Sequence, residues 1–283
     1  MIKIFKNAFK ITFNNIILAT PLLVFLFMLN IYLIVAKNAV SALPSAVLFY
    51  LTLFLMFSAF LAGWLYMVKI SIDNFKKGKS QEDINEPFKL LKEFPVGIAE
   101  YIKPYMGFSF LYLLFANIFV VTVYLIGIHF IGNVGISMKE FASATEAPVA
   151  MQALLDSMTK AQLLKVNYWY LLVMISVQIF SLGTMFWVVE IMYSTKNPLI
   201  AFFKSISRVF VKPQSILLFI GINVLNFVLV LLNYISMFNP ITYLFMTLVF
   251  FSFIVYVFVL LFLYYDEKIK GNRNSITNSD GQK

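Results

Sequence analysis

The side chains best placed to bind a ligand are amides and a hydroxyl that interrupt long apolar stretches. They are Asn117, Gln178, Ser181, Asn223, Asn226 and Asn233. The last three recur at intervals of three and seven residues, which places them on one face of a helix. Amides within hydrocarbon need hydrogen-bond partners, because lipid tails supply none. This candidate polar face predicts either hydrogen bonds between helices or a polar-lined cavity that admits a ligand, and the sequence leaves both open.

Ionisable side chains are absent from the centres of the apolar stretches. Inserting one costs about 2.5 to 3.5 kcal/mol, so its presence usually marks a function. Lys69 and Glu190 fall at the ends of stretches, where we expect them to reach water. His129 is the only histidine and Cys is absent, which disfavours a metal site. No Gly-rich phosphate loop and no Gly-x-Ser-x-Gly elbow occurs either, so we expect neither a cofactor nor catalysis.

Composition places the chain in a membrane. Of its 283 residues, 61% are hydrophobic and only 12% are charged, which exceeds what a water-soluble surface usually carries. A helix needs about 20 residues to cross the hydrocarbon. Six stretches are long enough: residues 16–36, 46–68, 105–131, 168–189, 215–235 and 241–265. We therefore predict an all-α, polytopic six-helix transmembrane bundle, with residues 1–270 as one integral domain and residues 271–283 as a disordered tail.

The basic residues sort onto alternate connections. Only Lys37, Lys139, Lys160 and Lys165 fall on the side opposite to the chain ends. Because Lys and Arg collect on the cytoplasmic side, both termini are expected there. The first stretch is longer than the apolar core of a signal peptide, which predicts an uncleaved anchor. The net charge of +9 therefore reflects topology, and the excess of lysine over arginine, twenty to two, disfavours nucleic-acid binding.

Short amphipathic helices are expected before three of the six spans. Their predicted apolar faces are Ile2, Phe5, Phe9 and Phe13; Phe88, Leu91 and Phe94; and Phe202, Ile206, Val209 and Phe210. The order of basic amphipathic helix, span, outer connection and span occurs three times, which indicates a threefold repeat of helical hairpins. These helices either anchor the bundle at anionic lipid or form a docking surface. Residues 69–104 suit a cytoplasmic protein partner best, because acidic residues nearly balance their lysines.

One outer connection, residues 132–167, is long. A helix is expected from about Pro148, with Met151, Leu154, Leu155, Met158 and Ala161 along its apolar face. This helix is interpreted either as an interfacial element that covers the outer mouth of the bundle or as a lid that binds a partner.

The sixth stretch ends in Tyr264-Tyr265-Asp266-Glu267-Lys268-Ile269-Lys270. This run resembles the Tyr-Tyr-Asp-x-Arg-x-Arg ending of a set of six-span bacterial membrane proteins, with lysine in place of both arginines. The set includes the membrane domain found beside glycerophosphoryl diester phosphodiesterases and related domains of unknown function. The resemblance implies a bacterial cytoplasmic membrane protein without catalysis of its own. The residues alone are typical of a helix end, with aromatics at the headgroups and charges in water.

Three functions remain, in order of preference. The first is a noncatalytic integral membrane protein that acts through partner or lipid contacts. The second is a small permease or channel-like transporter with a polar site between spans 3, 4 and 5. The third is a lipid-modifying enzyme. The expected partners are membrane lipid and a possible cytoplasmic protein at residues 69–104, whereas the sequence leaves the oligomeric state open.

Overall fold

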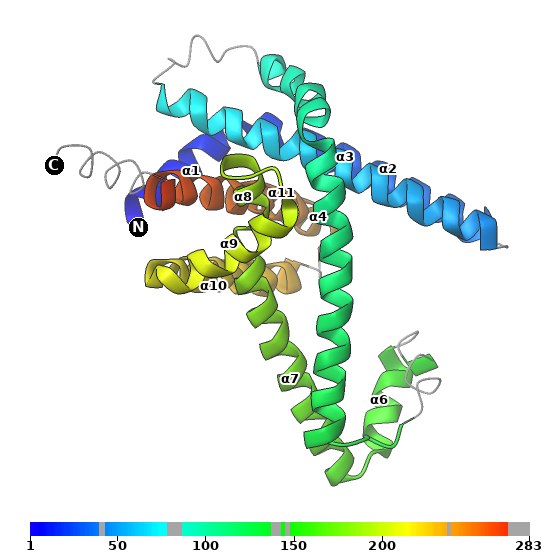
Figure 1. Ribbon diagram of the computed structural model, residues 1–283. Coiled ribbons are helices and arrows are strands. Elements are labelled where there is room, and N and C mark those ends of the chain that lie inside the picture. The colour runs from blue at the N-terminus through cyan, green and yellow to red at the C-terminus, as the bar shows by residue number, and fades with distance from the viewer. Residues whose placement is uncertain (40–42, 78–86, 137–142, 145–147, 237–238, 271–283) are drawn as a thin grey trace. The chain divides into compact units, whose positions relative to one another are not determined.

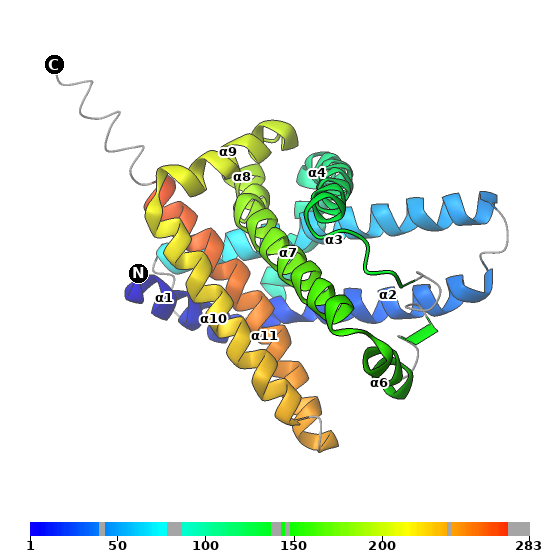
Figure 2. The same cartoon turned by 90° about the horizontal axis from the view of Figure 1, so that it is seen from below.

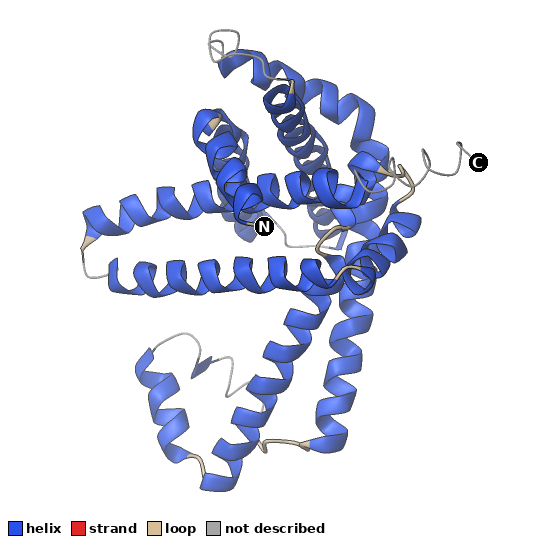
Figure 3. Ribbon diagram, turned by 90° about the vertical axis from the view of Figure 1, so that its left-hand side faces the viewer, coloured by secondary structure: helices blue, strands red, loops and turns tan. Residues whose placement is uncertain are grey.

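The computed structural model describes residues 1–39, 43–77, 87–136, 143–144, 148–236 and 239–270. Every regular element in these ranges is a helix (Figure 3), and six helices are long and apolar enough to cross a membrane. The predicted all-α, polytopic fold is confirmed. The predicted tail over residues 271–283 lies outside the described residues, as do residues 78–86 of the charged inner segment.

The helices follow the predicted order. They are α1 (Ile2–Asn14), η1 (Ile16–Leu18), α2 (Ala19–Ala39), α3 (Leu43–Lys76), α4 (Pro87–Phe130), α6 (Pro148–Ser157), α7 (Lys160–Thr184), α8 (Trp187–Tyr193), α9 (Pro198–Val211), α10 (Pro213–Ser236), α11 (Pro240–Tyr264) and the π-helix η2 (Tyr265–Lys270). In chain order, an amphipathic segment precedes each pair of spans. Helix α1 precedes α2 and α3, the first turns of α4 precede the span within α4 and then α7, and α9 precedes α10 and α11 (Figure 1).

The fourth span differs from its predicted bounds at both ends. Its helix α7 begins at Lys160 rather than at residue 168, because Thr159 and Gln162 form a reciprocal cap. The Thr159 N–H donates to Gln162 Oε1 at 2.9 Å, and the Gln162 N–H donates to Thr159 Oγ1 at 3.3 Å. At the other end, α7 stops at Thr184 and a short turn separates it from α8. The predicted helix start at Pro148 is confirmed, but this helix, α6, ends at Ser157, so Met158 lies beyond it and Ala161 belongs to α7.

The third span is longer than predicted. The amphipathic segment and the span join into α4, a helix of 44 residues with Pro95 and Pro104 inside it. At 1.5 Å per residue this helix is about 66 Å long, roughly twice the thickness of the hydrocarbon. Its first turns therefore extend well beyond the apolar layer of a membrane.

Contacts divide the chain into two compact units. The first comprises residues 1–111 and 183–283, and the second comprises residues 112–182. In the first unit, α1 packs on α11 and α3, and the spans pair as α2 with α3 and α10 with α11 (Figure 2). In the second unit, the Phe180 ring lies 4.9 Å from the Phe119 ring, and the Trp169 indole N–H donates to the Gly132 carbonyl at 3.1 Å.

The core of the first unit lies towards one end of its helices. Its largest fully buried side chains are Trp64, Trp187, Tyr105, Tyr264, Phe186 and Phe262. In α3 the buried residues run from Ser58 to Ile72, and in α11 they run from Val255 onward. These segments are the ends predicted to face the cytoplasm. The remaining turns expose long apolar faces, which suits contact with lipid.

Much of the predicted apolar face of these amphipathic helices is exposed, which suits the predicted contact with lipid. In α1, Ile4, Ala8 and Ile11 are at most 2% exposed, whereas Phe9 and Phe13 are more than half exposed. Phe88 in α4 and Phe210 in α9 are also exposed, at 70% and 72%, whereas Val209 on the same predicted face of α9 is fully buried. A small side chain such as Ala8 allows close approach to a neighbouring helix, so the bulky aromatic residues turn outward.

Two glycines bring α3 and α4 into close contact. A Cβ atom on Gly97 would lie 2.5 Å from Tyr66 Cβ and 2.9 Å from the Ala62 carbonyl oxygen. A Cβ atom on Gly63 would lie 2.8 Å from the Phe94 carbonyl oxygen. Small residues permit this approach between membrane helices, and it fixes the start of α4 against the end of α3.

Candidate functional site

The predicted polar residues divide between the two units. Asn117, Gln178 and Ser181 belong to the second unit, and Asn223, Asn226 and Asn233 lie along α10 in the first. The Asn117 and Asn223 amides donate to carbonyls of their own helices, those of Leu113 at 2.7 Å and Phe219 at 2.9 Å. Gln178 and Asn226 are exposed. The shared polar face therefore stays a prediction.

A second group of polar side chains, which the sequence interpretation missed, lies around α8 in the first unit. The turn between α7 and α8 frees backbone groups that a continuous helix would pair. Ser205 of α9, itself fully buried, satisfies two of them. Its hydroxyl accepts from the Phe186 N–H at 3.2 Å and donates to the Gly183 carbonyl at 2.8 Å. The Ser205 hydroxyl thus connects α9 to the turn between α7 and α8.

We expect Ser205→Ala to lower the free energy of unfolding by about 1 to 3 kcal/mol, because it leaves the Phe186 N–H and the Gly183 carbonyl buried without partners. Thermal unfolding of the detergent-solubilised protein, followed by tryptophan fluorescence, measures this loss. Ser207→Ala is the matched control, since Ser207 is exposed on the same helix. Equal melting temperatures for the two variants would contradict the role of Ser205.

Glu190 is a fully buried carboxylate, which corrects the expectation that it reaches water. Its Oε1 atom lies 3.2 Å from Arg208 Nε, and the side chain is 0% exposed against 26% for Arg208. Its Oε2 atom has no hydrogen-bond partner among the described residues. A buried carboxylate depends on its counter-charge, so α8 and α9 are joined at this pair as well as at Ser205.

The run that ends the sixth span completes this group. Tyr264 and Tyr265 are almost fully buried, which differs from the expected position of aromatic side chains at the headgroups. The Tyr264 and Ser215 hydroxyls lie 3.3 Å apart, and the Tyr265 hydroxyl lies close to Glu190. Asp266 pairs with Lys76 of α3. The two tyrosines therefore lie within the core of the unit, Lys268 and Lys270 are exposed, and the run contacts α3, α8 and α10.

Lysine ammonium groups and tyrosine rings alternate beside the core. Lys69 Nζ lies 5.9, 5.8 and 5.7 Å from the ring centres of Tyr66, Tyr101 and Tyr193. Lys196 Nζ is 4.8 Å from the Tyr101 ring, and Lys270 Nζ is 5.2 Å from the Tyr193 ring. Such contacts stabilise a cation in a partly dry environment. We call these six residues the lysine–tyrosine cluster.

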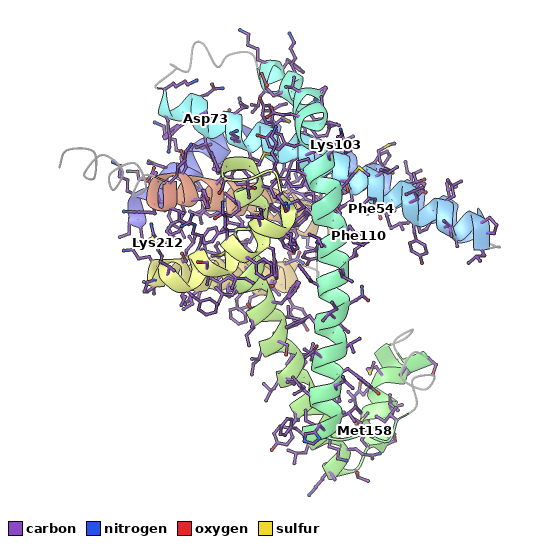
Figure 4. All side chains as sticks on the ribbon, viewed as in Figure 1. Phe54, Asp73, Lys103, Phe110, Met158 and Lys212 are labelled. Carbon is purple, nitrogen blue, oxygen red and sulfur yellow. The ribbon has the colours of Figure 1, made fainter. Side chains whose placement is uncertain are left out.

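The surroundings of the cluster carry both signs of charge. Lys196 Nζ lies 3.1 Å from Glu100 Oε1, and Asp73 lies on the last turns of α3 (Figure 4). At the junction of α9 and α10, Lys212 donates to the Lys268 carbonyl. Burial lowers the pKa of the Lys212 ammonium from its usual value, and the nearby charges of Arg208 and Lys268 lower it further.

The chemistry available here is ionic and aromatic contact. Among the described residues, no three His, Asp or Glu side chains gather closely enough to hold a metal ion. The signals for this site were present in the sequence as Glu190 at the end of an apolar stretch and Arg208 within an amphipathic helix.

Comparison with protein-family models, curated proteins and solved structures finds no match to this chain.

Proposed function

We propose that this chain is a noncatalytic multi-pass protein of a bacterial cytoplasmic membrane, with both termini cytoplasmic, that acts by docking a cytoplasmic protein at residues 69–104. It would belong with the six-span proteins whose Tyr-Tyr-Asp ending it resembles. Support comes first from the six apolar helices, which make the chain an integral membrane protein.

The observation that carries the proposal is an exposed face on the first turns of α4. Phe88 is 70% and Val96 is 47% exposed, and Lys92 lies exposed between them at intervals of four residues. Because α4 is about twice as long as the hydrocarbon is thick, this face extends beyond the membrane interior. Large apolar side chains exposed beside charged ones there suit a protein interface.

The charges around this face favour a protein over lipid alone. Glu93 and Glu100 lie on the same turns of α4 as its lysines, and Asp73 lies at the end of α3. Anionic headgroups attract lysines but repel carboxylates, whereas a protein surface can present both signs. The opposite side of the helix is held on α3 by Gly97, which gives the partner a rigid surface.

Site-specific photocrosslinking in cells tests the proposal. A benzophenone amino acid at position 88 or 96 is expected to form an adduct with one discrete protein. Val120, which is 64% exposed within the third span, is the matched control and should yield lipid adducts. Val96→Asp should weaken the protein adduct formed from position 88 by about tenfold, since it puts a charge into an apolar contact. Lipid adducts alone at positions 88 and 96 would contradict docking.

A further inference from the structure

A small, open hollow lies in the first unit between the α1–α2 junction and α11. Its lining residues are Thr12, Phe13, Ile16, Ala19, Ser252 and Val255. Both hydroxyls of the lining are already used within their own helices. Thr12 Oγ1 donates to the Ala8 carbonyl at 2.9 Å, and Ser252 Oγ donates to the Leu248 carbonyl at 3.0 Å. The hollow therefore offers hydrocarbon contact and suits an apolar occupant.

The helix that forms one wall of the hollow carries positive charge. Lys6, Lys10 and Phe13 follow one another at four and three residues, so they lie on the same exposed face of α1. Phe13 borders the hollow, and Lys10 and Lys6 lie one and two turns before it on α1. No acidic residue occurs in α1. An apolar hollow preceded by two lysines matches an acyl chain with a negatively charged head.

The wall is held in place by packing. Ile4, Ala8 and Ile11 bury the opposite face of α1, and α1 packs against α11 and α3. On the exposed side, the Phe9 ring lies 4.6 Å from the Phe13 ring and 6.5 Å from the Tyr256 ring of α11. The lysines and the hollow are therefore fixed relative to each other, as a binding site requires.

From this geometry we infer that the hollow holds part of one acyl chain of an anionic phospholipid of the surrounding bilayer, with its phosphate at Lys6 and Lys10. The site goes beyond the proposed function, because it uses α1 and α11 rather than the exposed face of α4, and it takes a lipid rather than a protein. A bound lipid would bridge the first amphipathic helix and the last span.

Native mass spectrometry of the full chain with added phosphatidylglycerol or phosphatidylcholine of identical acyl chains tests the site. We expect one phosphatidylglycerol to bind about tenfold more tightly than phosphatidylcholine. Lys6→Gln with Lys10→Gln should abolish this preference, and Lys165→Gln, a lysine of the second unit, should leave it unchanged. Equal binding of both lipids to the unaltered protein would overturn the headgroup assignment.

Substitutions that fill the hollow distinguish lipid binding at this site from nonspecific binding of lipid around the spans. Ser252→Leu and, independently, Ala19→Phe should each lower the binding of both lipids by about tenfold, provided that the variant melts near the unaltered protein. Undiminished binding in both variants would overturn the hollow as the site. None of these changes touches α4, so crosslinking from position 88 should persist in every variant, which keeps the two proposals distinguishable.

Discussion

Arg208→Gln is expected to lower the free energy of unfolding of the first unit by about 3 to 5 kcal/mol. The change leaves the Glu190 carboxylate, which is 0% exposed, without the guanidinium that lies 3.2 Å away. A carboxylate inside a protein is costly when it has no counter-charge. The buried Trp64 and Trp187 report unfolding directly, so tryptophan fluorescence during thermal or denaturant unfolding in detergent measures the loss.

Two further variants show whether the lower free energy of unfolding comes from the unpaired charge of Glu190. Glu190→Gln combined with Arg208→Gln removes both charges and should recover most of the stability that the single change loses. Lys204→Gln is the matched control on the same helix, because the Lys204 ammonium donates to an uncharged partner, the Ser194 hydroxyl, at 2.9 Å. If the double variant is as unstable as Arg208→Gln alone, the pair does not act through charge.

The spans could be predicted from the sequence because membrane insertion depends on the length and hydropathy of a continuous run. The helix ends were harder. The start of α7 depends on the local cap formed by Thr159 and Gln162, whereas the apolar run from which the span is predicted begins only at residue 168. The predicted third span begins at residue 105, directly after Pro104, yet α4 continues through this proline, because a proline removes one hydrogen bond without ending every helix.

The buried face of an amphipathic helix depends on its neighbour. The predicted apolar stripe of α1 is Ile2, Phe5, Phe9 and Phe13, because these residues recur at helical spacing on the side opposite its lysines. The face that α11 and α3 contact is built on Ala8, which is 0% exposed, since a small residue lets helices approach. A single sequence gives the period of a stripe, and only the packing decides which part of it faces the core.

The sequence carries Glu190 and Arg208 as signals of the polar centre around α8, but it does not show that they pair, for a related reason. Glu190 stands at the end of an apolar run, where a carboxylate usually reaches water. It is buried because α7 breaks before α8 and α9 folds over the break, with Ser205 and Arg208 supplying the partners. Each residue is unremarkable alone, and the site exists only through contacts between segments.

The close approach of α3 and α4 is the other feature that one substitution should disrupt strongly. Gly97→Leu places a side chain where even a Cβ atom would lie 2.5 Å from Tyr66 Cβ and 2.9 Å from the Ala62 carbonyl oxygen. These atoms belong to the backbone or adjoin it, so relief requires movement of a helix rather than a change of rotamer. We expect a loss of about 3 kcal/mol in the free energy of unfolding, measured by the same fluorescence assay.

Ala99→Leu is the matched control for Gly97→Leu, since Ala99 is exposed two residues further along the same helix and both changes improve or maintain helix propensity. A change in helix propensity alone would therefore leave Gly97→Leu as stable as the unaltered protein or more stable. Only the steric overlap of the leucine side chain with α3 would destabilise this variant. Tyr66→Ala should not restore the stability of Gly97→Leu, because the Ala62 carbonyl oxygen remains in place. Equal stability of the two leucine variants would mean that α3 and α4 lie farther apart than the contact at Gly97 requires. The start of α4 would then lack the rigid support that the proposed docking needs.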